Sequence, residues 1–250
     1  KLLESILESM DHLFSASKFC ASSIEHIGLP NYSIEPLYYG VDLEYYNPSN
    51  SGSAIRKKYL SNDNQKLVLF FARLLPEMGA DVLAESTHEI LKNNPESVLL
   101  VAGADGECSK LFRELEKKHS NRLFLEIDVP NEEKPALYAA ADLLIAPTRQ
   151  LHACMGMSIK EAMASGVANI SSNSGGIPEA VVDGETGILL KTGDDLRVKP
   201  ADLVNSIAEI LNDDKKRKSM EEKSRARAES IFNNKNTANR LRKVYKDLIE

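Results

Sequence analysis

Candidate ligand-binding residues are concentrated at 156–190, in the stretch GMSIKEAMASGVANISSNSGGIPEAVVDGETGILL. Gly156 allows the backbone to come close to a ligand. The helix predicted over about 158–165 then offers unpaired N–H groups and the positive end of its dipole to an anion. A second glycine-bearing loop, 174–176, precedes another predicted helix. Two such loops, each leading into a helix, predict a cradle for phosphate groups.

Glu161 lies one turn into the first of these helices, where its carboxylate can accept hydrogen bonds from the hydroxyls of a ribose. The same glutamate could instead fold back to the amide of Ser158, because the two residues have the spacing of a capping box. Taken alone, the two interpretations are about equally supported, and the surrounding motif favours ribose binding.

The segments that position these residues alternate between strands and helices. Continuous apolar runs, typical of strands buried on both faces, are separated by predicted helices. This alternation predicts a doubly wound α/β fold with a Rossmann-like parallel sheet. Ligands of such sheets bind outside the carboxyl ends of the strands, so the loops there should converge on one crevice. The predicted strands are 66–72, 97–103, 122–127, 142–148, 167–171 and 187–190.

Two of these strand ends carry further candidates for the crevice. Arg73 follows the first apolar strand, where a guanidinium is well placed for phosphate, although a surface arginine is the plain alternative. Gly103 opens the loop GADG after the second strand, and that loop alone is a weak signal because similar loops follow many strands.

The composition of the 250 residues excludes several classes of protein. The chain is 42% hydrophobic and 27% charged, which is typical of a globular protein, and no apolar run is long enough to span a bilayer. The net charge of −6 argues against nucleic acid as the partner. The three cysteines are scattered without a CxxC pair, which favours a reduced, cytoplasmic setting, with peripheral membrane attachment left open. No histidine has the spacing of a metal ligand, so neither a metal nor a cofactor is expected.

The resemblance of several motifs to known proteins is specific. The chain is similar to the C-terminal, donor-binding domain of GT-B glycosyltransferases, in particular the retaining family 4, also called glycosyl transferases group 1. The matching segments occur in the family's order over about residues 11–250. They are GVDLEYYNP at the interdomain hinge, ARLLPEMGADVL, VAGADGE, LYAAADLLIAPT, and finally GMSIKEAMASG with NSGGIPEAVVDGETGILL at the sugar-nucleotide motif.

The resemblance implies a division of the chain into domains. Residues 1–39 would end a truncated N-terminal acceptor domain, 40–53 would form the hinge, and 54–231 would form the nucleotide-sugar donor-binding domain. Residues 232–250 would form a C-terminal helix that returns toward the N-terminal domain. The chain begins at Lys1, inside a predicted helix and without an initiator methionine, so we expect a fragment of a longer protein.

The family also implies roles for individual residues. Arg73 matches the catalytic arginine that neutralises the donor diphosphate, and Glu161 matches the second glutamate of the E-x7-E motif, which binds ribose. The other implied donor-binding residues are Gly103 under the nucleotide, Ile127 and Val129 at the base, and Gly156, Met157 and Ser158 at the diphosphate.

Two positions depart from the family pattern. Met78 replaces the lysine that assists the departing diphosphate, and Ala153 replaces the first glutamate of E-x7-E, which contacts the donor sugar. A diphosphate gains negative charge as it leaves, so the loss of one cation there could cost a few kcal/mol of transition-state stabilisation.

The resemblance implies a hexosyltransferase that moves a sugar from a nucleotide-diphosphate donor to an acceptor hydroxyl with retention, the acceptor being a sugar, a lipid or a protein glycan. Met78 and Ala153 motivate an alternative, a catalytically impaired homologue that binds nucleotide or acts as a partner subunit. A sugar-nucleotide epimerase ranks last, because it needs acid and base side chains around the sugar and none is evident in the predicted crevice.

Overall fold

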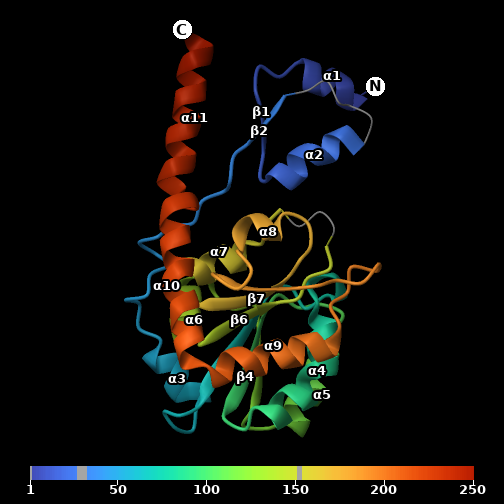
Figure 1. The fold of residues 1–250 in the computed structure, drawn as a ribbon, viewed down its shortest axis with the longest axis vertical. Coiled ribbons are helices and arrows are strands. Elements are labelled where there is room, and N and C mark those ends of the chain that lie inside the picture. The colour runs from blue at the N-terminus through green and yellow to red at the C-terminus, as the bar shows by residue number, and fades with distance from the viewer. Residues whose placement is uncertain (1, 27–32, 151–153) are drawn as a thin grey trace.

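The centre of the molecule is a sheet of six parallel strands, in the order β5-β4-β3-β6-β7-β8 (Figure 1). The structure is a computed structural model and describes residues 2–26, 33–150 and 154–250. The predicted α/β fold with a parallel sheet is therefore confirmed. The strands are β3 (Lys66–Phe71), β4 (Ser97–Gly103), β5 (Leu123–Ile127), β6 (Leu143–Ala146), β7 (Ala168–Ser172) and β8 (Gly187–Leu190).

Both faces of the sheet are covered, which explains why its strands read as continuous apolar runs. Because side chains alternate along a strand, Val68 and Phe70 enter the core on one face, and Leu67 and Leu69 enter the core on the other. All four of these β3 residues are at most 1% exposed. Burial on both sides fixes the sheet, and with it the position of every strand end.

The helices that follow the strands complete the two layers (Figure 1). Residues of α4, α5 and α9 build the core on one face, and residues of α3, α6 and α7 build it on the other, with α10 packed against α7. These helices are α3 (Ser53–Tyr59), α4 (Ala80–Asn93), α5 (Ser109–Lys118), α6 (Lys134–Ala140), α7 (Met157–Ala164), α8 (Ile177–Ala180), α9 (Pro200–Asn212) and α10 (Asp214–Ile231). Short 3-10 turns, η1 (Pro76–Met78) and η2 (Asn131–Glu133), lie in two of the connections.

The N-terminal part forms a separate small unit (Figure 1). It consists of α1 (Leu2–Glu8), β1 (Leu13–Ser15), α2 (Lys18–His26) and β2 (Ile34–Pro36). The strands β1 and β2 pair in parallel as a sheet of two strands. The last helix, α11 (Asn234–Ile249), runs beside this unit.

The chain crosses between the small unit and the large sheet at two adjacent places. The amide of Val41 donates to the carbonyl of Phe232 over 2.7 Å, and the amide of Asn234 donates back to Val41 over 3.2 Å. Gly40 permits this contact, because a Cβ atom there would lie 2.3 Å from the Cα atom of Asn234. The two crossings are thus hydrogen-bonded to each other.

Glu179 on α8 joins the small unit to the large sheet. Its carboxylate accepts hydrogen bonds from the amides of Lys18 and Phe19, at 2.9 and 2.8 Å, at the N-terminal end of α2. The hydroxyl of Tyr38 donates to the same carboxylate over 2.9 Å. Burial and this carboxylate raise the pKa of Tyr38 to about 12, so the hydroxyl remains a donor.

On α11, Arg240 pairs with Glu35 of β2 and lowers the pKa of that carboxyl.

Glu179→Gln should weaken the attachment of the small unit, because an amide keeps one acceptor oxygen where the carboxylate uses both. We expect a loss of about 0.5–1.5 kcal/mol in the free energy of unfolding, the usual net contribution of one hydrogen bond. Urea denaturation checks this value. Glu185→Gln, at an exposed glutamate near the same helix, is the matched control and should be neutral. Equal stability of the two variants would contradict the role given to Glu179.

Candidate functional site

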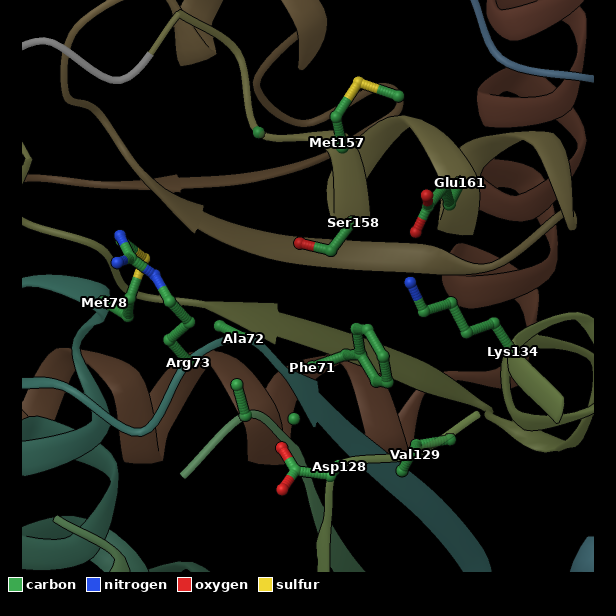
Figure 2. A pocket seen from close by; sticks show the side chains of 13 residues that line it. Phe71, Ala72, Arg73, Met78, Asp128, Val129, Lys134, Met157, Ser158 and Glu161 are labelled. Atoms are coloured by element: carbon green, nitrogen blue, oxygen red, sulfur yellow. The ribbon is translucent and has the colours of Figure 1, made fainter. Parts of the chain in front are cut away.

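A pocket of about 550 Å³ opens at the carboxyl edge of the large sheet (Figure 2). The pocket is lined by residues at the ends of β3, β4 and β5, in the turn η1, and at the start of α6 and α7. This position is the one expected for a ligand site of a doubly wound sheet. Its lining is Phe71, Ala72, Arg73, Met78, Gly103, Ala104, Asp128, Val129, Lys134, Gly156, Met157, Ser158 and Glu161.

Among the candidate residues named from the sequence, all except Ile127 line this pocket. Ile127 ends β5 and packs instead against the core cluster on the α4 side of the sheet. The second glycine-bearing loop, 174–176, is also absent from the lining, and Gly176 packs against the carbonyl of Cys154. Of the two predicted glycine-bearing loops, the one at Gly156 lines the pocket, and the role of the second loop toward a phosphate stays a prediction.

The amino end of α7 faces the pocket without a side-chain cap. Gly156 precedes the helix with φ +71°, a conformation that favours glycine, and no side chain in the described part of the chain accepts a hydrogen bond from the first turn. Ser158 is the second residue of the helix and does not cap it, so the capping-box interpretation of Ser158 and Glu161 is wrong. The first amides of α7 have no intrahelical acceptor, and they remain available to an anion.

Glu161 is held in place by a buried tyrosine. The hydroxyl of Tyr138 on α6 donates to Oε2 of Glu161 over 2.7 Å, and the Tyr138 side chain is fully buried. Burial and the adjacent carboxylate raise the pKa of Tyr138 and of Tyr46, whose rings lie 5.7 Å apart edge to face. Both hydroxyls therefore stay protonated beside the carboxylate. The carboxylate of Glu161 points into the pocket, as Figure 2 shows.

Two cations face the pocket from opposite ends (Figure 2). Arg73 is exposed, and within the described residues its guanidinium makes no ion pair or hydrogen bond. Lys134 lies at the start of α6, with Nζ 5.5 Å above the ring of Phe71 and directed toward Glu161. Arg73 was named from the sequence, whereas Lys134 and Phe71 were missed because nothing in the residues around them signals a site.

The loops after β3, β4 and β5 are packed closely under the pocket. The amide of Asp128 donates to the carbonyl of Gly103 over 2.8 Å. A Cβ atom at Gly103, which has φ +146°, would lie 1.8 Å from the carbonyl oxygen of Ala72. Asp128 itself has φ +56°, a left-handed conformation that is uncommon for a residue other than glycine. Sequence reasoning missed Asp128, because a left-handed aspartate has no signature in one sequence.

Met78 lies in the pocket where the resembled family has a lysine (Figure 2). Its side chain packs against the core and adds no charge, so Arg73 and Lys134 are the cations of the described lining. Ala153, the other departure from the family pattern, lies outside the described residues.

No described helix has the length and apolar character that crossing a membrane requires.

The chain is similar in sequence to members of one known family. The family model for glycosyl transferases group 1 matches residues 52–227, more than half of the chain. D-inositol 3-phosphate glycosyltransferase from Corynebacterium aurimucosum is 31% identical over 235 residues, which cover 90% of this chain and 53% of that protein. The chain thus spans about half the length of this curated relative.

Two solved structures share the fold at 21% sequence identity. Sucrose-phosphate synthase from Thermosynechococcus elongatus superposes with a TM-score of 0.83 and covers 99% of this chain and 61% of its own. Anabaena HepE, solved in complex with UDP and glucose, superposes with a TM-score of 0.81 and covers 98% of this chain and 66% of its own.

The anchoring of Glu161 can be tested with Tyr138→Phe. We expect the affinity for a nucleoside diphosphate to fall by about 0.5–1.5 kcal/mol, the usual net contribution of one hydrogen bond, because Glu161 loses its fixed orientation. Isothermal titration calorimetry measures the affinity. Tyr59→Phe is the control, since the Tyr59 hydroxyl also bonds a carboxylate, that of Glu126, away from the pocket lining. Unchanged affinity in Tyr138→Phe would count against this prediction.

Proposed function

Because the chain belongs to the glycosyl transferases group 1 family, we propose that the full protein is a retaining hexosyltransferase that uses a nucleotide-diphosphate sugar, with no metal or cofactor. One observation carries the proposal: a single pocket combines an anchored carboxylate with an arginine and a helix N-terminus that have no side-chain partner among the described residues. These groups match a diphosphate and a ribose, the parts that UDP, GDP and ADP sugars share.

The domain organisation of the proposal follows the fold. Residues 54–231 would be the donor-binding domain, 1–39 the end of an acceptor domain, and 40–53 a hinge, with 232–250 returning to the acceptor side. The paired crossings at Val41 and Asn234 support such a hinge. The acceptor, which would be a sugar, a lipid or a protein glycan, would then approach mainly from outside this chain.

In the proposed complex the diphosphate lies between Arg73 and the amides of Met157 and Ser158. A helix N-terminus and a guanidinium both stabilise the charge that a diphosphate gains as it leaves. The ribose would bind Glu161, and the base would lie toward Val129, with Gly103 beneath the nucleotide and Gly156 allowing the close approach. The UDP bound by the similar HepE supports a nucleotide sugar as the donor.

Met78 favours a second candidate, a catalytically impaired homologue that binds nucleotide or serves as a partner subunit. The pocket offers Arg73 at the diphosphate end, and the methionine side chain occupies the place where a second cation is expected. Sugar-nucleotide epimerisation ranks behind both, because it needs acid and base side chains around the sugar. The ionisable side chains of the described lining are two cations and the carboxylates of Asp128 and Glu161, and Glu161 is already bonded to Tyr138.

A panel of nucleotide sugars separates these candidates. We expect the full protein to hydrolyse at least one UDP, GDP or ADP sugar, or to transfer its sugar, with product analysis showing the retained configuration. Absence of turnover together with measurable binding would favour the impaired homologue. An isomerised sugar formed without acceptor would identify an epimerase.

Arg73→Ala should weaken the binding of nucleoside diphosphates by about 1.5–3 kcal/mol, the usual contribution of a hydrogen bond to a charged group. Calorimetry with UDP, GDP and ADP measures this loss and identifies the base. Arg242→Ala, which removes an exposed arginine of α11, is the matched control and should bind normally. If Arg73→Ala also bound normally, the diphosphate would not lie at this end of the pocket.

Met78→Lys should raise the turnover of the transferase, because it adds a cation beside the departing diphosphate. One oxyanion-type interaction contributes about 2.7–4 kcal/mol, so an increase of up to about a thousandfold in kcat is the upper expectation. Met78→Leu keeps the volume without the charge and should leave kcat unchanged. Equal kcat in Met78→Lys and Met78→Leu would show that the missing lysine does not limit this enzyme.

A further inference from the structure

Two cysteines that are far apart in the sequence lie against each other between the small unit and the large sheet. The Sγ atoms of Cys20, on α2, and Cys154, just before α7, are 2.6 Å apart. Both side chains are partly buried, and they are not joined by a disulfide bond in this structure. The scattered positions of the cysteines in the sequence gave no sign of this contact.

The backbone around both cysteines is tightly fixed. The amide of Cys20 donates to the hydroxyl of Ser17 over 2.9 Å, and Ser17 is fully buried. Gly176 lies between the two chain segments, since a Cβ atom there would be 2.1 Å from the carbonyl oxygen of Cys154 and 2.9 Å from Oγ of Ser17. The absence of a side chain at Gly176 therefore lets the two segments meet.

The hydrogen bonds of Glu179 also hold α2 of the small unit against the large sheet. Its carboxylate accepts from the amides of Lys18 and Phe19, directly before Cys20. Hydrogen bonds of the backbone at residues 18–20 thus hold the segment that carries Cys20 against the large sheet.

We propose that Cys20 and Cys154 form a reversible disulfide bond, with a low-molecular-weight disulfide such as oxidised glutathione as the oxidant. The thiolate of one cysteine attacks the oxidant, forms a mixed disulfide and releases one glutathione thiolate. The thiolate of the other cysteine then attacks the protein sulfur of the mixed disulfide and releases the second glutathione. Two cysteine thiols are oxidised, one disulfide is reduced to two thiols, and the cysteine protons pass to the released thiolates.

The bond would connect the small unit to the edge of the nucleotide pocket. Cys154 lines a second cavity of about 230 Å³, which adjoins the first and shares Gly156 and Ser158 with it. A cross-link at this place would hold α2 against the segment that leads into α7. Oxidation is therefore expected to fix the small unit relative to the donor pocket, and reduction to release it.

The test uses the full protein in oxidised glutathione, followed by alkylation of the remaining thiols under denaturing conditions and mass spectrometry. Burial raises the pKa of the Cys154 thiol to about 11, so mildly alkaline buffer is chosen to increase the thiolate fraction. We expect one linked peptide pair that contains Cys20 and Cys154, while the buried Cys108 stays alkylated. Dithiothreitol added before the alkylation step should reduce the disulfide bond, so that both cysteines are then alkylated.

Three variants make the result specific. Cys108→Ser should leave the cross-link intact, and Cys20→Ser and Cys154→Ser should abolish it. The oxidised protein should also have a higher thermal unfolding midpoint than the reduced protein, and this difference should disappear in Cys20→Ser. The proposal is overturned if both cysteines stay alkylated or carry separate glutathione groups in protein whose circular dichroism shows it to be folded, or if the cross-link involves Cys108. None of these outcomes depends on transferase activity.

Discussion

Parallel hydrogen bonding of β3 to β4 and β6 is the constraint on which the rest of the molecule depends. It places the carboxyl ends of these strands at one edge of the sheet, so that segments from distant parts of the sequence end next to one another. Gly103 can then lie against the carbonyl of Ala72, and Asp128 can bond Gly103. The floor of the pocket is thus a direct consequence of how the strands pair.

Helix α7 connects this floor to the rest of the molecule. Two adjacent residues on it face different partners: Glu161 reaches the pocket, and Lys160 points to the chain crossing, where its Nζ donates to the carbonyl of Tyr39 over 2.7 Å. Lys160 is 2% exposed, and burial lowers its pKa to about 8. The helix that carries the proposed diphosphate site is therefore also hydrogen-bonded to the crossing. Through this bond, a movement of the small unit would be transmitted to α7 and the pocket.

Much of the fold and part of the site could be predicted from the sequence. The apolar runs identified the six strands of the large sheet, because burial on both faces leaves a local pattern in each strand. Gly156, Met157, Ser158 and Glu161 were also recognisable, since a glycine followed by a helix is a local feature. The roles of these residues toward a donor remain predictions. Where two local patterns competed at Ser158, the structure removed one of them, because the start of α7 at Met157 excludes the capping box.

What the sequence by itself determined was therefore the order and type of the elements and the residues at the strand ends, because these follow from neighbours along the chain. Tertiary structure alone decided which residues meet across the chain. It brought Tyr138 to Glu161, Lys134 to Phe71, and Cys20 to Cys154. Such contacts depend on how helices pack on the sheet, and no periodicity or spacing within one sequence encodes a pairing between residues of different elements.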